Sequence, residues 1–393
     1  MPQNNDISKL LDLEDIETEK IENGINLIKI GFHLKRRPHT CPSCGGITET
    51  VHDYRIQKVK DLPIQGKKLI WEYRKRRYRC PYCGKRFYES TPQLPKWHRI
   101  TGRTAAYCID LLKERTSQKD VAKAIGVSAS TVNRWFGLVS YGKPKKLPEV
   151  LSIDEFKGNT DGEKFQCILA DAKNKKVIDI LPTRKAVDIS QYLLEYRDKS
   201  RVKIVVMDMN KAYLETMRSV LPGAEVVIDR FHVIRQCTWA FENVRKRIQK
   251  SLPEYERKYF KRSRKLLLSR MSCLSEENKA AAEVMLSYSS ELTNAYLLKE
   301  YFYMFMDSKD RSEAEERLKW FRMQAGIAKV KEFDRFLTTL NNWNKYILNA
   351  FKYLYSNGYT EGVNNSIKVI KRTGFGYRNF ENFRKRIMLV HTG

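Results

Sequence analysis

Three apolar runs in the second half of the chain each end in an aspartate, and this pattern constrains the fold more than any other feature. "EVLSIDEF" ends its run at Asp154, "RVKIVVMDMN" at Asp208 and "AEVVIDRFHVI" at Asp229. Such β-branched runs predict buried strands. Residues 164–182 predict two more strands around a polar turn, and the apolar spacing of 186–197 and 211–223 predicts helices. Because a helical crossover between parallel strands is right-handed, we expect a mixed sheet with the Asp208 strand beside the Asp154 strand.

Asp154 and Asp208 would then lie side by side, which favours a cation between them. Two adjacent carboxylates repel and lose solvation unless a cation offsets their charge. Mg²⁺ prefers carboxylate oxygens, and two metals can stabilise the attacking and leaving oxygens of a phosphodiester. The alternative is a pair of strand ends that merely reach solvent. The pattern does not choose among the acids that could complete the site, which are Glu155, Asp171, Asp179, Asp229 and Glu361.

The first half of the chain carries two Cys-x-x-Cys pairs, "CPSCGG" (41–46) and "CPYCGKRF" (80–87). The glycine after each pair lets the backbone turn and direct its amides at the thiolates. Four thiolates suit one tetrahedral zinc ion, and redox motifs would need a βαβ context that is missing here. The pattern predicts a zinc ribbon with a long hairpin arm, in which Zn²⁺ is bound by Cys41, Cys44, Cys80 and Cys83.

The arm sequence "KKLIWEYRKRRYRC" interleaves cations with Tyr73 and Tyr78. Basic side chains neutralise phosphates and tyrosines can stack on bases. The residues predicted to bind DNA here are Arg74, Arg76 and Arg77. A solvated strand face is the alternative interpretation.

"SQKDVAKAIGVSASTVNRWF" is typical of a helix-turn-helix. Gly126 supplies the turn, Ser128 can cap the second helix, and Val132 and Trp135 are predicted to face inward. A plain pair of antiparallel helices is the alternative. The residues predicted to face the major groove are Ser130, Thr131, Asn133 and Arg134.

The charge balance favours a polyanionic partner. The chain has 74 Lys and Arg against 46 Asp and Glu, a net charge of +28. Nucleic acid is the commonest such partner, and the cations are not confined to one amphipathic helix of the kind that binds membrane surfaces. We find no signal peptide and no apolar run that could cross a membrane. We therefore expect a cytoplasmic, nucleoid-associated protein without a membrane partner.

Four blocks then resemble the ISL-three family of bacterial insertion-sequence transposases. They are "LSIDEF", "VVMDMNKAY", "VIDRFHVI" and "EGVNNSIKVIKRTGFGYRNFENFRKRI". The cysteine pairs and the helix-turn-helix resemble the family's N-terminal half, so the likeness covers residues 35–389. It implies a DDE transposase whose catalytic acids are Asp154, Asp208 and Glu361, with Mg²⁺ (or Mn²⁺) as cofactor.

The resemblance also implies the reaction. Metal-dependent hydrolysis would free a 3′-OH at the element end, and that hydroxyl would attack target duplex DNA without a covalent enzyme intermediate. Synapsis of two ends would need a homodimer or a larger assembly.

Asp229 and His232 resemble an Asp-x-x-His pair of such transposases, or form an internal hydrogen bond. Side chains that could hold phosphates, or form a solvated helix face, are Lys368, Lys371 and Arg372. Helical tryptophans that could stack on an extruded base, or belong to the core, are Trp239, Trp320 and Trp343.

The predicted fold class is multidomain α+β: an N-terminal zinc ribbon and helix-turn-helix, then an RNase H-like α/β mixed-sheet core interrupted by an all-α insertion. The predicted boundaries are 1–38 for an N-terminal segment, 39–95 for the ribbon, 96–142 for the helix-turn-helix, 148–234 and 351–393 for the two parts of the core, and 235–350 for the insertion. Two other functions remain open: a non-enzymatic DNA-binding protein on a decayed core, and a structure-specific nuclease without strand transfer.

Overall fold

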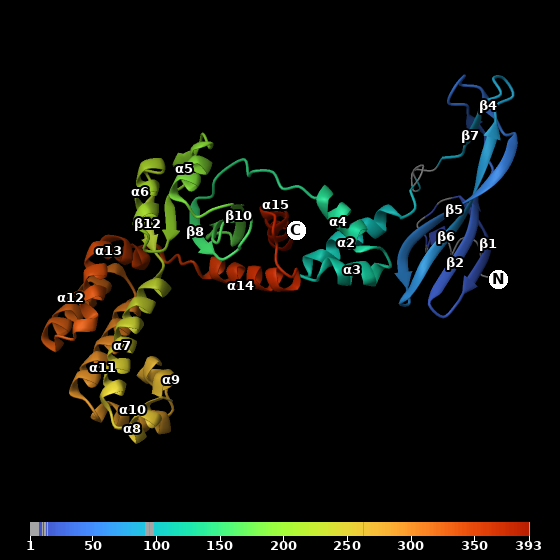
Figure 1. Cartoon of the computed structure of the whole chain (residues 1–393). Coiled ribbons are helices and arrows are strands. Elements are labelled where there is room, and N and C mark those ends of the chain that lie inside the picture. The colour runs from blue at the N-terminus through green and yellow to red at the C-terminus, as the bar shows by residue number, and fades with distance from the viewer. Residues whose placement is uncertain are drawn as a thin grey trace.

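The computed structural model describes residues 8–9, 11, 13, 15–90, 94, 98–261 and 263–392. Its parts follow one another in space much as they do along the chain (Figure 1). An N-terminal sheet lies at one end, three helices and a second sheet lie in the middle, and a helical arm extends from the other side. The C-terminal helix lies in the middle, between the three helices and the second sheet.

The N-terminal sheet joins the predicted hairpin arm to the segment that precedes the first cysteine pair. Its strands are β1 (Ile16–Asn23), β2 (Leu27–Leu34), β5 (Val51–Ile64), β6 (Lys67–Arg79) and β7 (Arg86–Tyr88). Their order is β1-β2-β6-β5, with β7 on β6, and β2 runs parallel to β6. Phe32 stacks on Tyr73 in its core. A small separate pair is β3 (His39–Thr40) and β4 (Ile47–Thr48). Residues 1–7 of the predicted N-terminal segment lie outside the described residues.

Three helices follow: α2 (Gly102–Lys113), α3 (Gln118–Ile125) and α4 (Ala129–Leu138). As predicted, Gly126 turns the chain at a φ of 72°, and the Ser128 side chain accepts from the Thr131 amide at the start of α4. Val132 is buried as predicted, and Trp135 is half-buried and packs against the same apolar core. Sequence reasoning missed Phe136, which lies one turn after Val132 and is buried more completely than Trp135.

The second sheet has the mixed topology expected from the sequence. Its strands are β8 (Val150–Phe156), β9 (Gln166–Asp171), β10 (Lys176–Leu181), β11 (Ile204–Met207) and β12 (Glu225–Ile228). The order is β10-β9-β8-β11-β12. β9 is antiparallel to both β8 and β10, whereas β11 is parallel to β8 and to β12. The prediction that the Asp208 strand lies beside the Asp154 strand is therefore confirmed.

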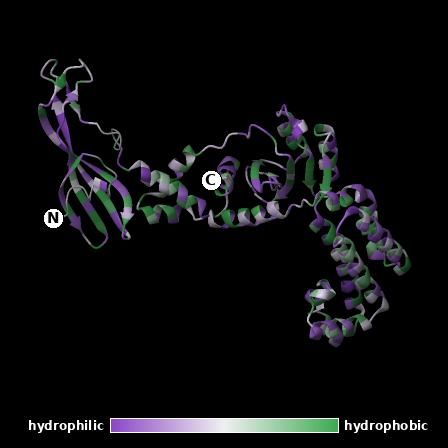
Figure 2. Ribbon diagram, turned by 180° about the vertical axis from the view of Figure 1, so that it is seen from behind, coloured by the Kyte–Doolittle hydropathy of each residue, from purple (hydrophilic) through white to green (hydrophobic). Residues whose placement is uncertain are grey.

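Helices cover both faces of this second sheet. α5 (Ala186–Leu194) and α6 (Lys211–Val220) pack on the face that carries Leu151 and Ile153. α14 (Gly358–Thr373) and α15 (Phe380–Thr392) pack on the opposite face, against Ile168 and Ile180. Apolar residues dominate the strands of this sheet, whereas the helices carry both kinds (Figure 2).

The arm consists of α7 (Arg230–Ser251), α8 (Glu254–Lys261), α9 (Ser263–Leu268), α10 (Glu276–Ser287), α11 (Ser290–Met306), α12 (Arg311–Ala328) and α13 (Asp334–Tyr353). No strand occurs among the described residues of 235–350, as the all-helical prediction requires. α7 starts directly at the end of β12, so one helix carries the chain from the sheet edge into the arm (Figure 1). Within the described part of the chain, no helix is long and apolar enough to cross a membrane.

The C-terminal basic and aromatic tail of the sequence forms a helix, α15, which joins the three N-terminal helices to the second sheet. Phe383 and Ile387 pack against the sheet, while Leu389 belongs to the apolar core of α2–α4. The Arg386 guanidinium also donates to the Thr116 carbonyl at 2.5 Å. The helix-turn-helix is thus fixed to the sheet.

Candidate active site

The three aspartates meet at one edge of the second sheet. Ser152 of β8 pairs with Val206 of β11, and Asp154 and Asp208 each lie two residues beyond this pair. Asp229 follows β12 directly, and its amide donates to the Met207 carbonyl at 3.1 Å. The strand register therefore brings Asp154 and Asp208 to the same edge, as the sequence pattern predicted, and adds Asp229, which that pattern left among the candidates.

Asp154 occupies an unfavourable position for a carboxylate. Burial raises the pKa of its carboxyl group to about 7, and the charge of Asp208 contributes to this shift. Two donors hold its orientation: Asn364 Nδ2 lies 2.8 Å from Oδ2, and the Glu155 amide lies 2.7 Å from Oδ1. A nearby cation would favour the ionised form of this group.

His232 bridges the other two aspartates from the first turn of α7. Its Nδ1 lies 2.7 Å from Asp208 Oδ1 and 3.3 Å from Asp229 Oδ2. Burial alone would lower the pKa of His232, but the hydrogen bonds and charges of the two aspartates outweigh it and raise the pKa to about 10. One ligand atom from each of the three side chains lies within 4.8 Å of the others. The imidazolium therefore neutralises part of the acidic charge.

Glu361 reaches the same edge from a distant part of the sequence. It lies in the first turn of α14, and its amide donates to the Asn357 carbonyl at 2.8 Å. Asn357 is anchored in turn, because Ser152 Oγ donates to its Oδ1 at 2.8 Å and its own amide donates to Asp229 Oδ1 at 3.3 Å. Ser152 also contacts Thr360 Oγ1 at 2.6 Å. These contacts fix the start of α14 on β8.

A cleft of about 250 Å³ opens where these elements meet. Asp208 is joined to this cleft by its contact with His232. The side chains that carry charge in its lining are Asp154, Glu155, Lys157, Asp229, His232, Glu361 and Lys368. The cleft unites most of the sequence-predicted catalytic and accessory residues. Sequence reasoning missed Asn357 and Asn364 as the residues that position them, since their partners are some 200 positions away.

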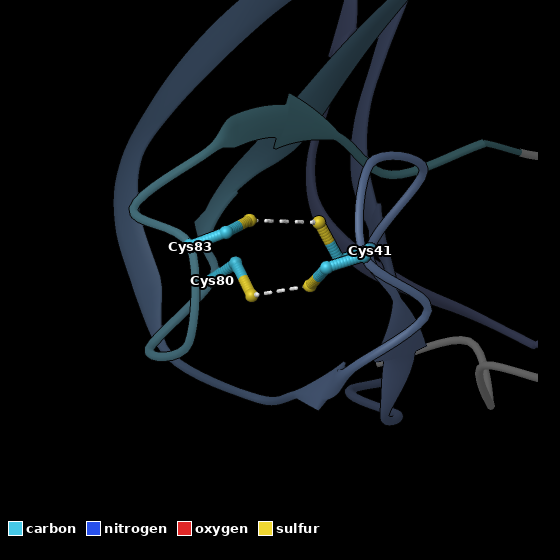
Figure 3. A group of neighbouring side chains, drawn as sticks. Cys41, Cys80 and Cys83 are labelled. Atoms are coloured by element: carbon cyan, nitrogen blue, oxygen red, sulfur yellow. Dashed lines mark hydrogen bonds between the residues drawn. The ribbon is translucent and has the colours of Figure 1, made fainter.

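The four paired cysteines form a second cluster at the end of the N-terminal sheet (Figure 3). Cys41 Sγ lies 3.6 Å from Cys83 Sγ, and Cys44 Sγ lies 3.5 Å from Cys80 Sγ. A tetrahedral zinc with Zn–S bonds of about 2.3 Å requires sulfur separations of about 3.8 Å. Gly45 and Gly84 adopt φ values of 73° and 70°, which explains why glycine follows each pair.

The hairpin arm places its predicted DNA-binding residues unequally. Arg74 is exposed, with its guanidinium 4.3 Å from the Tyr54 ring centre, and Arg77 forms an ion pair with Asp53. Arg76 is only 5% exposed and donates to the Leu34 carbonyl beside Glu89. We therefore correct the prediction for Arg76, which stabilises the sheet instead of facing solvent.

Tyr73 and Tyr78 also do not meet their predicted role. Both side chains are fully buried, so they cannot stack on bases. Sequence reasoning missed a different surface, a cleft of about 480 Å³ beside β5. Its charged lining is entirely basic among the described residues and comprises Arg55, Lys58, Lys75 and Arg99, together with His98. The cations come from three separate stretches of sequence, so no single run signalled them.

The other predicted DNA-binding residues lie on two surfaces. Ser130, Asn133 and Arg134 are exposed on α4, whereas the Thr131 hydroxyl contacts Ser128 Oγ at 2.9 Å. On α14, Lys368 and Arg372 are exposed, and Lys371 Nζ donates to the Lys157 carbonyl at 3.1 Å.

Comparison with known proteins identifies the family. A transposase model matches residues 151–387, which is more than half of the chain. The chain belongs to the ISL3 family of transposases. Two further models match its N-terminal parts: "zinc-finger of transposase IS204/IS1001/IS1096/IS1165" at 37–83, and "Helix-turn-helix domain of transposase family ISL3" at 89–136. The family expected from the sequence blocks is confirmed, as are the zinc ribbon and the helix-turn-helix.

Two curated proteins show sequence similarity. The transposase for insertion sequence element IS1001 of Bordetella parapertussis is 27% identical over 365 residues, which cover 90% of this chain and 89% of that protein. A protein of Lactococcus lactis subsp. lactis described as an ATP-dependent protease is 35% identical over 107 residues, 27% of this chain and 33% of that protein. The first match supports a DNA transposase along nearly the whole chain. The second is too short to bear on activity.

Proposed function

We propose that this transposase cuts and joins DNA strands with divalent metal ions held by Asp154, Asp208 and Glu361. The observation that carries the proposal is the half-buried Asp154 carboxyl beside Asp208, at the edge where Glu361 is also anchored. A structural role would not require two acids side by side in a partly buried cleft. A metal site accounts both for the two adjacent acids and for their position in the cleft.

The donor set fits Mg²⁺ or Mn²⁺. Carboxylate oxygens are the ligands that these ions prefer, and Glu361 is exposed in the cleft and free to turn toward them. When bound, the ions would stabilise negative charge on the attacking and leaving oxygens of a phosphodiester. The RNase H-like assignment of the core is supported by the strand order and by helices on both faces of the sheet.

The surrounding residues have separate tasks in this proposal. Asn364 holds one oxygen of Asp154 in place through its 2.8 Å hydrogen bond. His232 offsets part of the negative charge of Asp208 and Asp229, because its Nδ1 lies within ion-pair distance of both carboxylates. Lys368, on the cleft wall one to two turns beyond Glu361, offers a positive charge to a DNA phosphate.

DNA recognition is assigned to the N-terminal modules. Arg134 and its exposed neighbours on α4 would contact the element ends in the major groove, and the basic cleft beside β5 would hold the phosphate backbone. Target duplex DNA would enter at the cleft of the second sheet. A homodimer or larger assembly would hold the two ends together.

The test is cleavage and joining of DNA that carries the element's end repeats, with Mg²⁺. Asp154→Asn and Glu361→Gln are compared with wild type and with Glu149→Gln, a matched control at the opposite end of β8 whose carboxylate pairs with Lys173. We expect both site variants to bind the ends but to cut at least ~100-fold more slowly, and the control to cut normally. Equal cleavage by all four proteins would refute the metal site. If wild type cuts the DNA but forms no joined products, the protein is a nuclease without strand transfer. If wild type binds the ends but does not cut them, the protein is a DNA-binding protein on a decayed core.

A further inference from the structure

One exposed stripe of α7 carries side chains that the catalytic site does not use. Phe231, Arg235 and Trp239 are spaced four residues apart, and all three are exposed, whereas Val233 and Cys237 on the other side of α7 are buried. Phe231 is 48% exposed and Trp239 is 50% exposed. We call these three residues the α7 stripe. Exposed aromatic side chains also occur elsewhere on this chain, but here two of them share one helix face with a cation between them.

The α7 stripe begins inside the catalytic cleft. Phe231 lines that cleft together with Asp154 and Glu361, and its ring lies 5.4 Å from the His232 ring in an edge-on arrangement. From there α7 leads away from the sheet into the helical arm (Figure 1). A DNA strand that leaves the cleft along α7 would meet Arg235 and then Trp239.

The side chains of the stripe are already arranged as a platform. The Arg235 guanidinium lies 4.5 Å from the centre of the Trp239 ring, a cation–π contact that holds both planar groups in place. The next exposed positions toward the end of α7, Asn243 and Lys246, bring no negative charge. A platform of aromatic rings and cations suits nucleotides, since bases stack on rings and phosphates pair with cations.

The chemistry also indicates which form of DNA fits. Bases inside a duplex are covered by their neighbours and cannot stack on protein rings, whereas unpaired bases can. Eight residues of helix span ~12 Å, the length of roughly three to four stacked nucleotides. The stripe therefore matches a short single strand more closely than a duplex.

We propose that the α7 stripe binds unpaired nucleotides of the strand next to the cleavage site, with Trp239 as the main stacking residue. This inference depends on the proposed function, because it assumes that the cleft holds the reacting phosphodiester. It adds a subsite for the single strand that cleavage exposes.

The test compares two DNAs by fluorescence anisotropy with the full chain and without divalent metal. One is a fully paired element end, and the other is the same end with four unpaired nucleotides at the cleavage position. We expect Trp239→Ala to weaken binding of the second DNA by about 5- to 100-fold and binding of the first by less than about two-fold. Trp239→Phe, which keeps a ring, should lie between. Tyr255→Ala, which removes a 73% exposed aromatic on α8, is the matched control and should bind both DNAs normally.

The decisive quantity is the ratio of the two affinities. If Trp239→Ala leaves this ratio unchanged, the α7 stripe does not bind unpaired nucleotides. If Trp239→Ala does not fold, Arg235→Gln is measured in its place, and an unchanged ratio has the same meaning. An unchanged ratio together with a loss of dimer on size exclusion would mean that the stripe contacts another copy of the chain, which also overturns the proposal. Failure of the proposed function would be detected separately, in the cleavage assay: the wild-type protein would bind the element ends but would not cut them with Mg²⁺.

Discussion

Asp154 shows how a single residue links the fold to the chemistry. Its backbone belongs to β8, and its half-buried carboxyl group lies beside Asp208; loss of solvation and then the charge of Asp208 raise its pKa to about 7. A proton or a cation must therefore compensate its charge near neutral pH. Asn364 donates to one of its oxygens, so the carboxylate faces the cleft in a fixed orientation.

At the same scale, we predict that Asn364→Ala slows cleavage by about 10- to 100-fold and raises the Mg²⁺ concentration needed for half-maximal rate, because Asp154 loses the partner that orients it. The measurement is a Mg²⁺ titration of the cleavage rate on element-end DNA. Thr373→Ala, at the far end of the same helix, is the control, because its hydroxyl donates to the Val369 and Ile370 carbonyls of α14. The orienting role would be contradicted if the variant cut more slowly at every Mg²⁺ concentration while the midpoint of its Mg²⁺ titration stayed at the wild-type value.

The sequence predicted residues well where local chemistry decides their role. Gly126 and Ser128 could be placed because turns and helix caps depend on neighbouring residues. Arg76 could not, because its burial depends on Glu89 and on the Leu34 carbonyl, which only strand pairing brings to it. Asn357 was missed for the same reason, since its partner Ser152 is distant in sequence.

At the scale of elements, α15 decides how the helix-turn-helix meets the catalytic sheet. Arg384 Nε lies 2.6 Å from Asp179 Oδ1 of β10, and both side chains are largely buried. The same guanidinium donates to the Tyr141 carbonyl in the segment that follows α4. The sequence indicated a basic tail here, and its helical form follows from apolar contacts with two different cores, which no local pattern reveals.

We predict that Arg384→Met lowers the free energy of unfolding of the second sheet and its helices by ~3 kcal/mol or more, because Asp179 is left buried without its cation. The double variant Arg384→Met, Asp179→Leu should recover a large part of that loss. Urea titration followed by circular dichroism measures both. Lys185→Met removes the exposed ion pair with Glu163 and should leave the urea midpoint unchanged. A double variant no more stable than the single one would contradict a buried-charge effect.

On the scale of the whole molecule, binding and chemistry are separated along the chain. The cysteine cluster and the basic cleft belong to the N-terminal sheet, and the acidic cleft belongs to the second sheet. These sheets lie at one end and in the middle of the molecule, and α7 carries the chain from the second sheet into the helical arm (Figure 1). Parts distant in sequence meet at the acidic cleft, where α14 returns to β8 after the entire arm. The order of the sequence blocks predicted the domain types, and Trp239 was among the tryptophans that could stack on a base. The sequence could not choose between stacking and the core for Trp239, because its exposure depends on how the arm packs.

The most direct measurement of the central claim exchanges the ligand atom itself. Asp154→Cys and Asp208→Cys are assayed for cleavage of element-end DNA with Mg²⁺ and with Mn²⁺, beside Glu149→Cys as the control. Thiolate is a poor ligand for Mg²⁺ and a better one for softer metals. We predict that both site variants cut at less than about 1% of the wild-type rate with Mg²⁺. Their cleavage rate should rise at least about ten-fold when Mn²⁺ replaces Mg²⁺, while the control cuts with either ion. Site variants that respond to the two ions as wild type does would contradict metal coordination by these residues.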